Sequence, residues 1–123
     1  MIKLALTTAL AAVAFSASAF AAQWNVTEAN KAGIKRAQGT WTVATEGDKV
    51  SGKSEMQLDN GSMLTYKLEG ELTGGVYTLK LVDRSDSKKN CVWTGKPVEG
   101  AHNVFIGEAA CDGEKIVIRG GQN

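Results

Sequence analysis

Few residues in this sequence have the types and spacing that catalysis requires. The single histidine, His102, stands beside Asn103, and no serine or cysteine nucleophile can be joined to it. Asp83, Arg84 and Asp86 share a polar segment that could bind an ion, although we interpret it as a solvated loop. Catalysis needs a positioned base, nucleophile or metal, and one histidine cannot complete a zinc site. We therefore expect no catalytic residue, metal or cofactor, and a binding protein rather than an enzyme.

The two cysteines, Cys91 and Cys111, are the remaining reactive residues. Their midpoint is residue 101, so an antiparallel hairpin centred there sets them directly opposite one another. Opposed cysteines on neighbouring strands can meet disulfide geometry. The alternative is a metal or redox pair, but the Cys-x-x-Cys spacing is absent from the sequence. We predict a structural disulfide, which the chain-entropy relation values at roughly 3 kcal/mol.

The N-terminus has the pattern of a cleavable secretory signal peptide. Lys3 supplies a positive charge, residues 4–20 are uncharged and mostly apolar, and residues 19–21 form a small-x-small cleavage site. The alternative is a membrane anchor, which needs roughly 20 strongly apolar residues, whereas this stretch is rich in Ala, Ser and Thr. We expect residues 1–21 to be removed, leaving a periplasmic or secreted protein without a membrane span. Such a compartment permits disulfides.

The net charge of the mature chain limits which classes of partner it can bind. The sequence has 14 basic and 13 acidic residues, and loss of Lys3 leaves no net charge. Nucleic-acid and anionic-membrane binders carry a basic excess or a basic stripe, and neither is visible here. We expect no nucleic-acid partner, and a monomer with a single modest core.

The strands are indicated by two-residue alternation of apolar and polar side chains after residue 38. In the clearest hairpin, a two-residue turn at 74–75 pairs Leu72 with Tyr77 and, on the other face, Glu69 with Lys80. Similar reasoning over the whole chain predicts which side chains point inward. These are Trp41, Val43, Val50, Met56, Leu58, Leu64, Tyr66, Leu68, Leu72, Tyr77, Leu79, Leu81, Trp93, Phe105, Ile116 and Ile118.

The predicted fold is all-β: a small antiparallel up-and-down meander barrel of seven or eight strands with one disulfide. A sandwich is the alternative, but closure into a barrel removes exposed strand edges. Inward glycines at positions 52, 70, 95 and 107 suit tight curvature. The expected organisation is a signal peptide at 1–21, an N-terminal arm or short helix at 22–38, and the β-barrel domain at 39–123. Residues 23–26 are the candidate eighth strand.

Gly39-Thr40-Trp41 at the first clear strand, together with Arg119 in the last, resembles the calycin superfamily. That superfamily contains the lipocalins, the avidins and small periplasmic metalloprotease inhibitors, in which the tryptophan of a Gly-x-Trp motif packs against a basic residue of the last strand. The resemblance covers residues 39–119 and implies a meander barrel in which Trp41 and Arg119 meet, with a cation–π contact in reach. It also implies a binding function.

Two functional hypotheses follow. In the first, the protein is a protein-binding module, such as a hydrolase inhibitor, that acts through the N-terminal arm and nearby loops. Trp24 is of the residue type that dominates interface energetics, and Lys31, Lys35 and Arg36 would suit an acidic partner. Trp24 could instead cap the barrel.

In the second hypothesis, the protein is a small-molecule carrier of lipocalin or avidin type. Tyr66, Tyr77 and Trp93 point inward with polar atoms and would line the ligand cavity. The interior of an eight-stranded barrel is often just filled by its own side chains. A cavity lined by these residues would favour the carrier, and a filled barrel would favour the protein binder.

Overall fold

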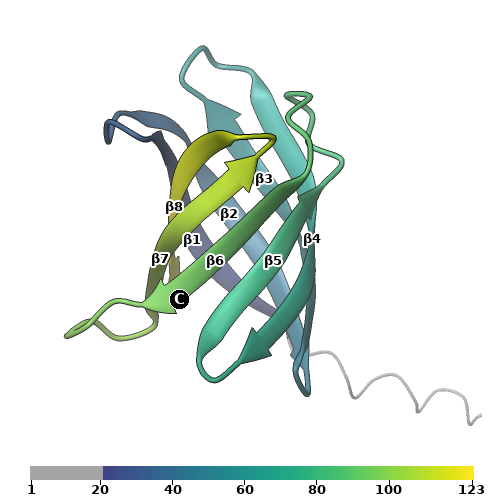
Figure 1. Cartoon of the computed structure of the whole chain (residues 1–123), viewed down its shortest axis with the longest axis vertical. Coiled ribbons are helices and arrows are strands. Elements are labelled where there is room, and N and C mark those ends of the chain that lie inside the picture. The colour runs from purple at the N-terminus through teal and green to yellow at the C-terminus, as the bar shows by residue number, and fades with distance from the viewer. Residues whose placement is uncertain (1–20) are drawn as a thin grey trace, which may run out of the picture.

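The structure is a computed structural model that describes residues 21–123. Apart from Ala21, the predicted signal peptide lies outside the described residues. Figure 1 shows a single barrel whose strands follow one another around the wall in sequence order. The strands are β1 (Ala21–Asn30), β2 (Lys35–Glu46), β3 (Lys49–Leu58), β4 (Met63–Thr73), β5 (Val76–Val82), β6 (Cys91–Pro97), β7 (Val104–Cys111) and β8 (Glu114–Gln122).

Each strand pairs antiparallel with the next, and β1 pairs with β8, so the sheet is closed. The predicted all-β meander barrel is therefore confirmed, with eight strands. The part of the chain that the structure describes contains no helix of the length and apolarity needed to cross a membrane.

The prediction that residues 22–38 form an arm or short helix is wrong. They form β1, the first turn, and the start of β2. β1 pairs with β2 from Ala21 onward and with β8 between Trp24 and Asn30, which leaves no edge open. Backbone hydrogen bonding explains the outcome, because without this strand the facing edges of β2 and β8 would be unpaired.

The predicted registers agree with the structure. Glu69 pairs with Lys80 across the β4–β5 turn. Cys91 pairs with Cys111, and the two form the predicted disulfide. Gly61, in the connection between β3 and β4, has φ 91°, a left-handed conformation that glycine adopts without steric cost. Because the side-chain period of a strand is two, correct registers also place the correct side chains inside.

The core contains all sixteen predicted inward residues; only Leu58, Leu72 and Phe105 among them are partly rather than fully buried. Aromatic rings fill the barrel. The rings of Trp41 and Trp93 meet edge to face with centroids 5.1 Å apart, and Tyr77 stacks on Trp93 at 6.4 Å. The further side chains that are buried are Trp24, Val26, Glu28, Ala37, Ser54, Arg84, Cys91, Ala109 and Cys111.

Glycine makes room for these rings at two inward positions. A Cβ atom at Gly95 would overlap the indole of Trp93, and one at Gly120 would press on the indole of Trp24. The large aromatic residues and the glycines are therefore complementary parts of one packing arrangement.

The barrel has two ends that differ in their connections. One end, at the top of Figure 1, carries the segments 31–34, 59–62, 83–90 and 112–113. We call it the loop end. The opposite end carries the segments 47–48, 74–75 and 98–103.

Candidate functional site

The loop end is the candidate functional site because it carries buried charges below and exposed apolar side chains above. Its longest connection, residues 83–90 between β5 and β6, is held from inside the barrel by Arg84. The guanidinium donates to Glu28 of β1 through Nη1 to Oε2 (3.2 Å) and through Nη2 to Oε1 (3.0 Å). It also donates to Asp86, through Nε to Oδ1 (3.0 Å) and Nη2 to Oδ2 (2.8 Å).

The network continues into the core through Tyr66. The Tyr66 hydroxyl donates to Glu28 Oε2 at 2.6 Å and accepts a hydrogen bond from Trp41 Nε1 at 3.0 Å. The guanidinium of Arg84 lies 4.7 Å from the centroid of the Tyr66 ring, which is a cation–π distance. The interpretation of this segment as a solvated loop is therefore wrong for Arg84, whose side chain points from the loop into the barrel and is buried.

The expected contact between Trp41 and Arg119 is also wrong. Trp41 is fully buried, whereas Arg119 is exposed on the outer wall, opposite Thr27 of β1 and Ile106 of β7. The sequence pattern already indicated this outward position. Ile118 was predicted to point inward, and adjacent side chains of a strand point to opposite faces, so Arg119 must point outward. Arg84 is the basic residue that reaches the interior aromatic rings instead.

The pKa values reflect this burial. Burial works against the charged guanidinium of Arg84, but hydrogen bonds to Asp86 and Glu28 outweigh it and hold its pKa above the ordinary value. Burial raises the pKa of Tyr66 well above 10.0, and the negative charge of Glu28 adds to this effect. For Asp86, burial is outweighed by the hydrogen bonds and charge of Arg84, so its pKa is lowered. The guanidinium of Arg84 therefore lies between the carboxyl groups of Glu28 and Asp86.

The remainder of the 83–90 segment is fixed by further side-chain contacts. The backbone N–H of Lys88 donates to Asp86 Oδ1 at 3.2 Å, and its ammonium group lies 2.9 Å from each carboxylate oxygen of Glu114. Asn90 donates to Asp112 at 2.7 Å. These contacts join the β5–β6 connection to the β7–β8 turn, so that two segments of the loop end behave as one unit.

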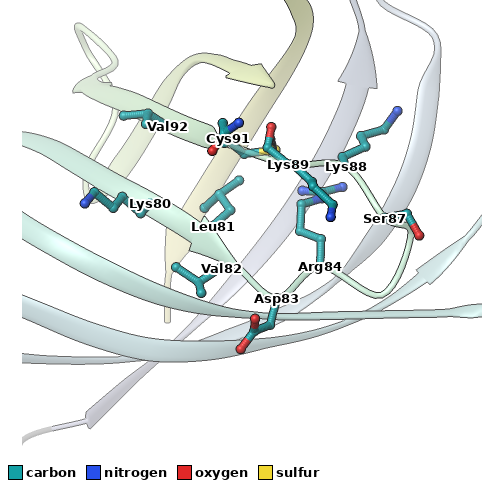
Figure 2. A pocket seen from close by; sticks show the side chains of 11 residues that line it. Lys80, Leu81, Val82, Asp83, Arg84, Ser87, Lys88, Lys89, Cys91 and Val92 are labelled. Carbon is teal, nitrogen blue, oxygen red and sulfur yellow. Dashed lines mark hydrogen bonds between the residues drawn. The ribbon is translucent and has the colours of Figure 1, made fainter. Parts of the chain in front are cut away.

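A groove of about 610 Å³ runs beside this segment, along β5 and β6. Figure 2 shows Lys80 on one of its walls, and Lys88 and Lys89 on the loop above. Lys89 forms no ion pair within residues 21–123, whereas Lys88 is paired with Glu114. The groove therefore presents positive charge beside the anchored segment.

Two large apolar side chains are exposed at the rim of the loop end. Ile34 in the β1–β2 turn and Met63 at the start of β4 are each 60% exposed. Arg36 at the start of β2 pairs with Asp59 in the β3–β4 connection at 3.0 Å, and so joins the segment that follows Ile34 to the segment that precedes Met63. Exposed apolar side chains with charged residues around them are what a protein-binding surface would need.

The predicted binding residues fall into two groups. Lys31, Lys35 and Arg36 are exposed at the loop end, as a binding role requires. Trp24 is fully buried and stacks on Trp41, with centroids 5.7 Å apart, so its display to a partner is excluded.

The residues predicted to line a ligand cavity, Tyr66, Tyr77 and Trp93, do point inward, but their rings pack against neighbouring rings. Four features were not predicted from the sequence: the exposed Ile34 and Met63, the buried Glu28, and the inward side chain of Arg84. Only the burial of Glu28 could have been predicted. Glu28 is four residues from Trp24 on the same strand and so faces the same side, and a buried carboxylate needs a cationic partner.

In residues 21–123 the structure brings together no group of three acidic, histidine or cysteine side chains that could hold a metal ion. Comparison with known proteins gives no family: neither a family model, nor a curated protein, nor a solved structure matches the chain.

Proposed function

We propose that this chain is a small periplasmic or secreted binding protein, monomeric and without catalytic activity, whose loop end docks onto an acidic surface of another protein. The observation that carries the proposal is the exposure of Ile34 and Met63 beside basic side chains, on an end that Arg84 anchors from within. A pre-ordered surface loses less conformational entropy on binding than a mobile one.

The four segments of the loop end carry equal numbers of basic and acidic residues, but lysines that form no ion pair support an acidic partner. Lys31, Lys35 and Lys89 form no ion pair within the described residues. Free cations at the rim of an interface steer an oppositely charged protein and raise the association rate. The apolar pair, Ile34 and Met63, then supplies area that is removed from water in the complex.

A hydrolase is the partner class that we favour, so that binding would inhibit it. The anchored 83–90 segment projects at the top of the barrel in Figure 1 and has the rigidity needed to block a cleft. The disulfide is compatible with the oxidising compartment in which such a partner would be met.

The carrier hypothesis keeps one supporting observation. The indole N–H of Trp24 and the hydroxyl of Ser54 are buried without a hydrogen-bond partner in residues 21–123. A small polar ligand held inside the barrel would satisfy them. Since the three tryptophans are all in the core, a ligand entering it would change their fluorescence, which a titration with candidate small molecules can detect.

The test of the protein-binding proposal compares two double variants as bait in periplasmic extract. Ile34→Ser/Met63→Ser removes the apolar pair of the loop end, and Ile106→Ser/Val117→Ser removes two apolar side chains from the outward face of the barrel wall, neither of which lines the loop-end groove. We expect wild type and the wall variant to retain the same partner, identified by mass spectrometry, and the loop-end variant to lose it. Titration of the purified partner should then show weakening of at least about tenfold, and a captured hydrolase should lose activity. Equal capture by both variants would overturn the proposal.

A further inference from the structure

Arg119, which was expected to contact Trp41, lies outside the barrel core. It lies on β8, facing outward, and its cross-strand neighbours are Thr27 on β1 and Ile106 on β7. Among residues 21–123 it forms no ion pair, in contrast to Arg36 and Arg84. An arginine without a carboxylate partner on a strand face has its full fork of donors free for a ligand.

Arg119 borders a groove of about 570 Å³ in the outer wall of the barrel. The groove crosses β1 and reaches β2 and β3 on one side and β7 and β8 on the other. Gly121 lies two residues beyond Arg119, on the same face, and a Cβ there would meet only Val104, at 3.8 Å. The missing side chain leaves the wall hollow beside the guanidinium.

The other lining side chains that face outward are almost all neutral hydrogen-bonding groups. Register places Gln57 beside Gln38, Gln38 beside Thr27, and Thr27 beside Arg119, in one row across four strands. Asn25 and Thr40 form the neighbouring pair. Amides and hydroxyls both donate and accept, so this row matches a ligand whose own groups do the same.

Each side-chain amide of the groove has a hydrogen-bond partner: Gln38 Oε1 accepts from Lys35 Nζ at 2.7 Å, and Gln57 Nε2 donates to the carbonyl oxygen of Gly61 at 3.3 Å. Asn25 Nδ2 donates to the side-chain oxygen of Asn123 at 2.9 Å, which fixes the orientation of the Asn25 side chain. An amide held in this way recognises hydrogen-bonding groups more selectively than a freely rotating one, because less rotamer freedom is lost on binding.

We propose that this groove is a binding site for an acidic saccharide, with one carboxylate paired to Arg119 and sugar hydroxyls bonded to Gln38, Thr27 and their neighbours. Arginine is suited to carboxylates because its planar fork binds both oxygens. Arg119 in the groove and Lys35 at its edge, whose ammonium group lies 2.7 Å from Gln38 Oε1, do not make the basic stripe that a polyanion such as a nucleic acid needs. The volume lies within the range of small-ligand sites.

The saccharide site shares no lining residue with the groove at the loop end. Its failure and the failure of the protein-binding proposal are therefore separable, since Ile34→Ser/Met63→Ser should leave saccharide binding unchanged. The saccharide site would bring the protein to acidic glycans while the loop end remains free for a protein.

The test is calorimetric titration of the full secreted protein with a trimer of galacturonic acid, alongside a galactose trimer and acetate as probes. We expect binding of the acidic trimer, and weakening of at least about tenfold in Arg119→Gln. Lys115→Gln, which removes a charge from the outward face of the same strand, should bind like wild type. Thr27→Val keeps the shape of the side chain without its hydroxyl and should weaken binding in the same direction.

Three results would overturn the saccharide site: no binding of the acidic trimer, equal affinity for the galactose trimer, or equal affinity for acetate alone. The first result would show that the acidic saccharide is not a ligand. The second would show that the carboxylate does not contribute to binding, and the third that the sugar hydroxyls do not. Equal affinity of Arg119→Gln and wild type would place the binding elsewhere on the barrel.

Discussion

Arg84 and Glu28 form a buried, bidentate ion pair between the β5–β6 connection and the strand that closes the barrel, with side chains only 1% and 3% exposed. The two residues are 56 positions apart in the sequence. A buried ion pair is costly to form but also costly to break, because removing one member leaves the other charged and desolvated. The pair therefore ties the conformation of the loop end to barrel closure.

Replacing Arg84 by methionine should lower the free energy of unfolding by about 3–5 kcal/mol, since Glu28 is left as an unpaired buried charge. The measurement is urea denaturation at neutral pH. Lys115→Met is the matched control, because it breaks the exposed Lys115–Glu108 pair at 3.5 Å and should cost less than about 1 kcal/mol. Similar losses in the two variants would mean that the buried pair contributes little.

Asp86 should make stability depend on acid pH. Its pKa is lowered in the folded protein, so its contribution is present above the ordinary pKa of 3.8 and is lost as pH falls through the folded value. Asp86→Asn should be less stable than wild type at neutral pH, and the difference should shrink below pH 3.8. Asp48→Asn, in an exposed turn at the opposite end, controls for the loss of a carboxylate. A constant difference between Asp86→Asn and wild type at every pH would contradict the assignment.

Deleting residues 22–30 should abolish the native fold, because it removes β1 together with Trp24 and Glu28. Near-ultraviolet circular dichroism would report the loss of fixed aromatic packing. A milder variant isolates the core contribution: Trp24→Ala should cost about 3–5 kcal/mol, whereas Trp24→Phe keeps an aromatic ring and should cost less. A truncated protein with native spectra would show that the barrel does not need this strand.

The disulfide should stabilise the barrel by limiting the unfolded chain. Cys91 and Cys111 are 20 residues apart, and a loop of this size is worth roughly 3 kcal/mol. We expect Cys91→Ala/Cys111→Ala to melt at a clearly lower temperature and to be unaffected by reductant, whereas reductant should lower the melting temperature of wild type. Thiol titration of the native protein should find no free cysteine, and detection of two thiols would refute the bond.

The sequence was most informative where local patterns repeat. Alternation of side chains, together with glycine at the turns, placed Glu69 opposite Lys80, and the symmetry of the two cysteines placed β6 against β7. Such patterns predict the structure because a hairpin register depends on residues close in sequence, and because a slip of one residue would turn every apolar side chain of the strand outward. The candidate eighth strand at 23–26 is confirmed as part of β1, but its continuation to Asn30 was missed, because the charged Glu28 occupies an inward position there.

Only the tertiary structure decided which charged residues lie inside. Arg84 and Asp86 share one polar segment, but nothing in the sequence indicates that Glu28, 56 positions from Arg84, is the other partner of this arginine; closing the barrel brings Glu28 to it. By contrast, the alternation of side chains along β8 already predicted that Arg119 points outward. That Thr27 and Gln38 lie beside it is known only from the pairing of β1 with β8 and β2. Apolar burial can be predicted from periodicity because it is non-directional. An ion pair and a row of hydrogen-bonding groups depend on the positions of atoms from distant strands, which exist only once the sheet has closed.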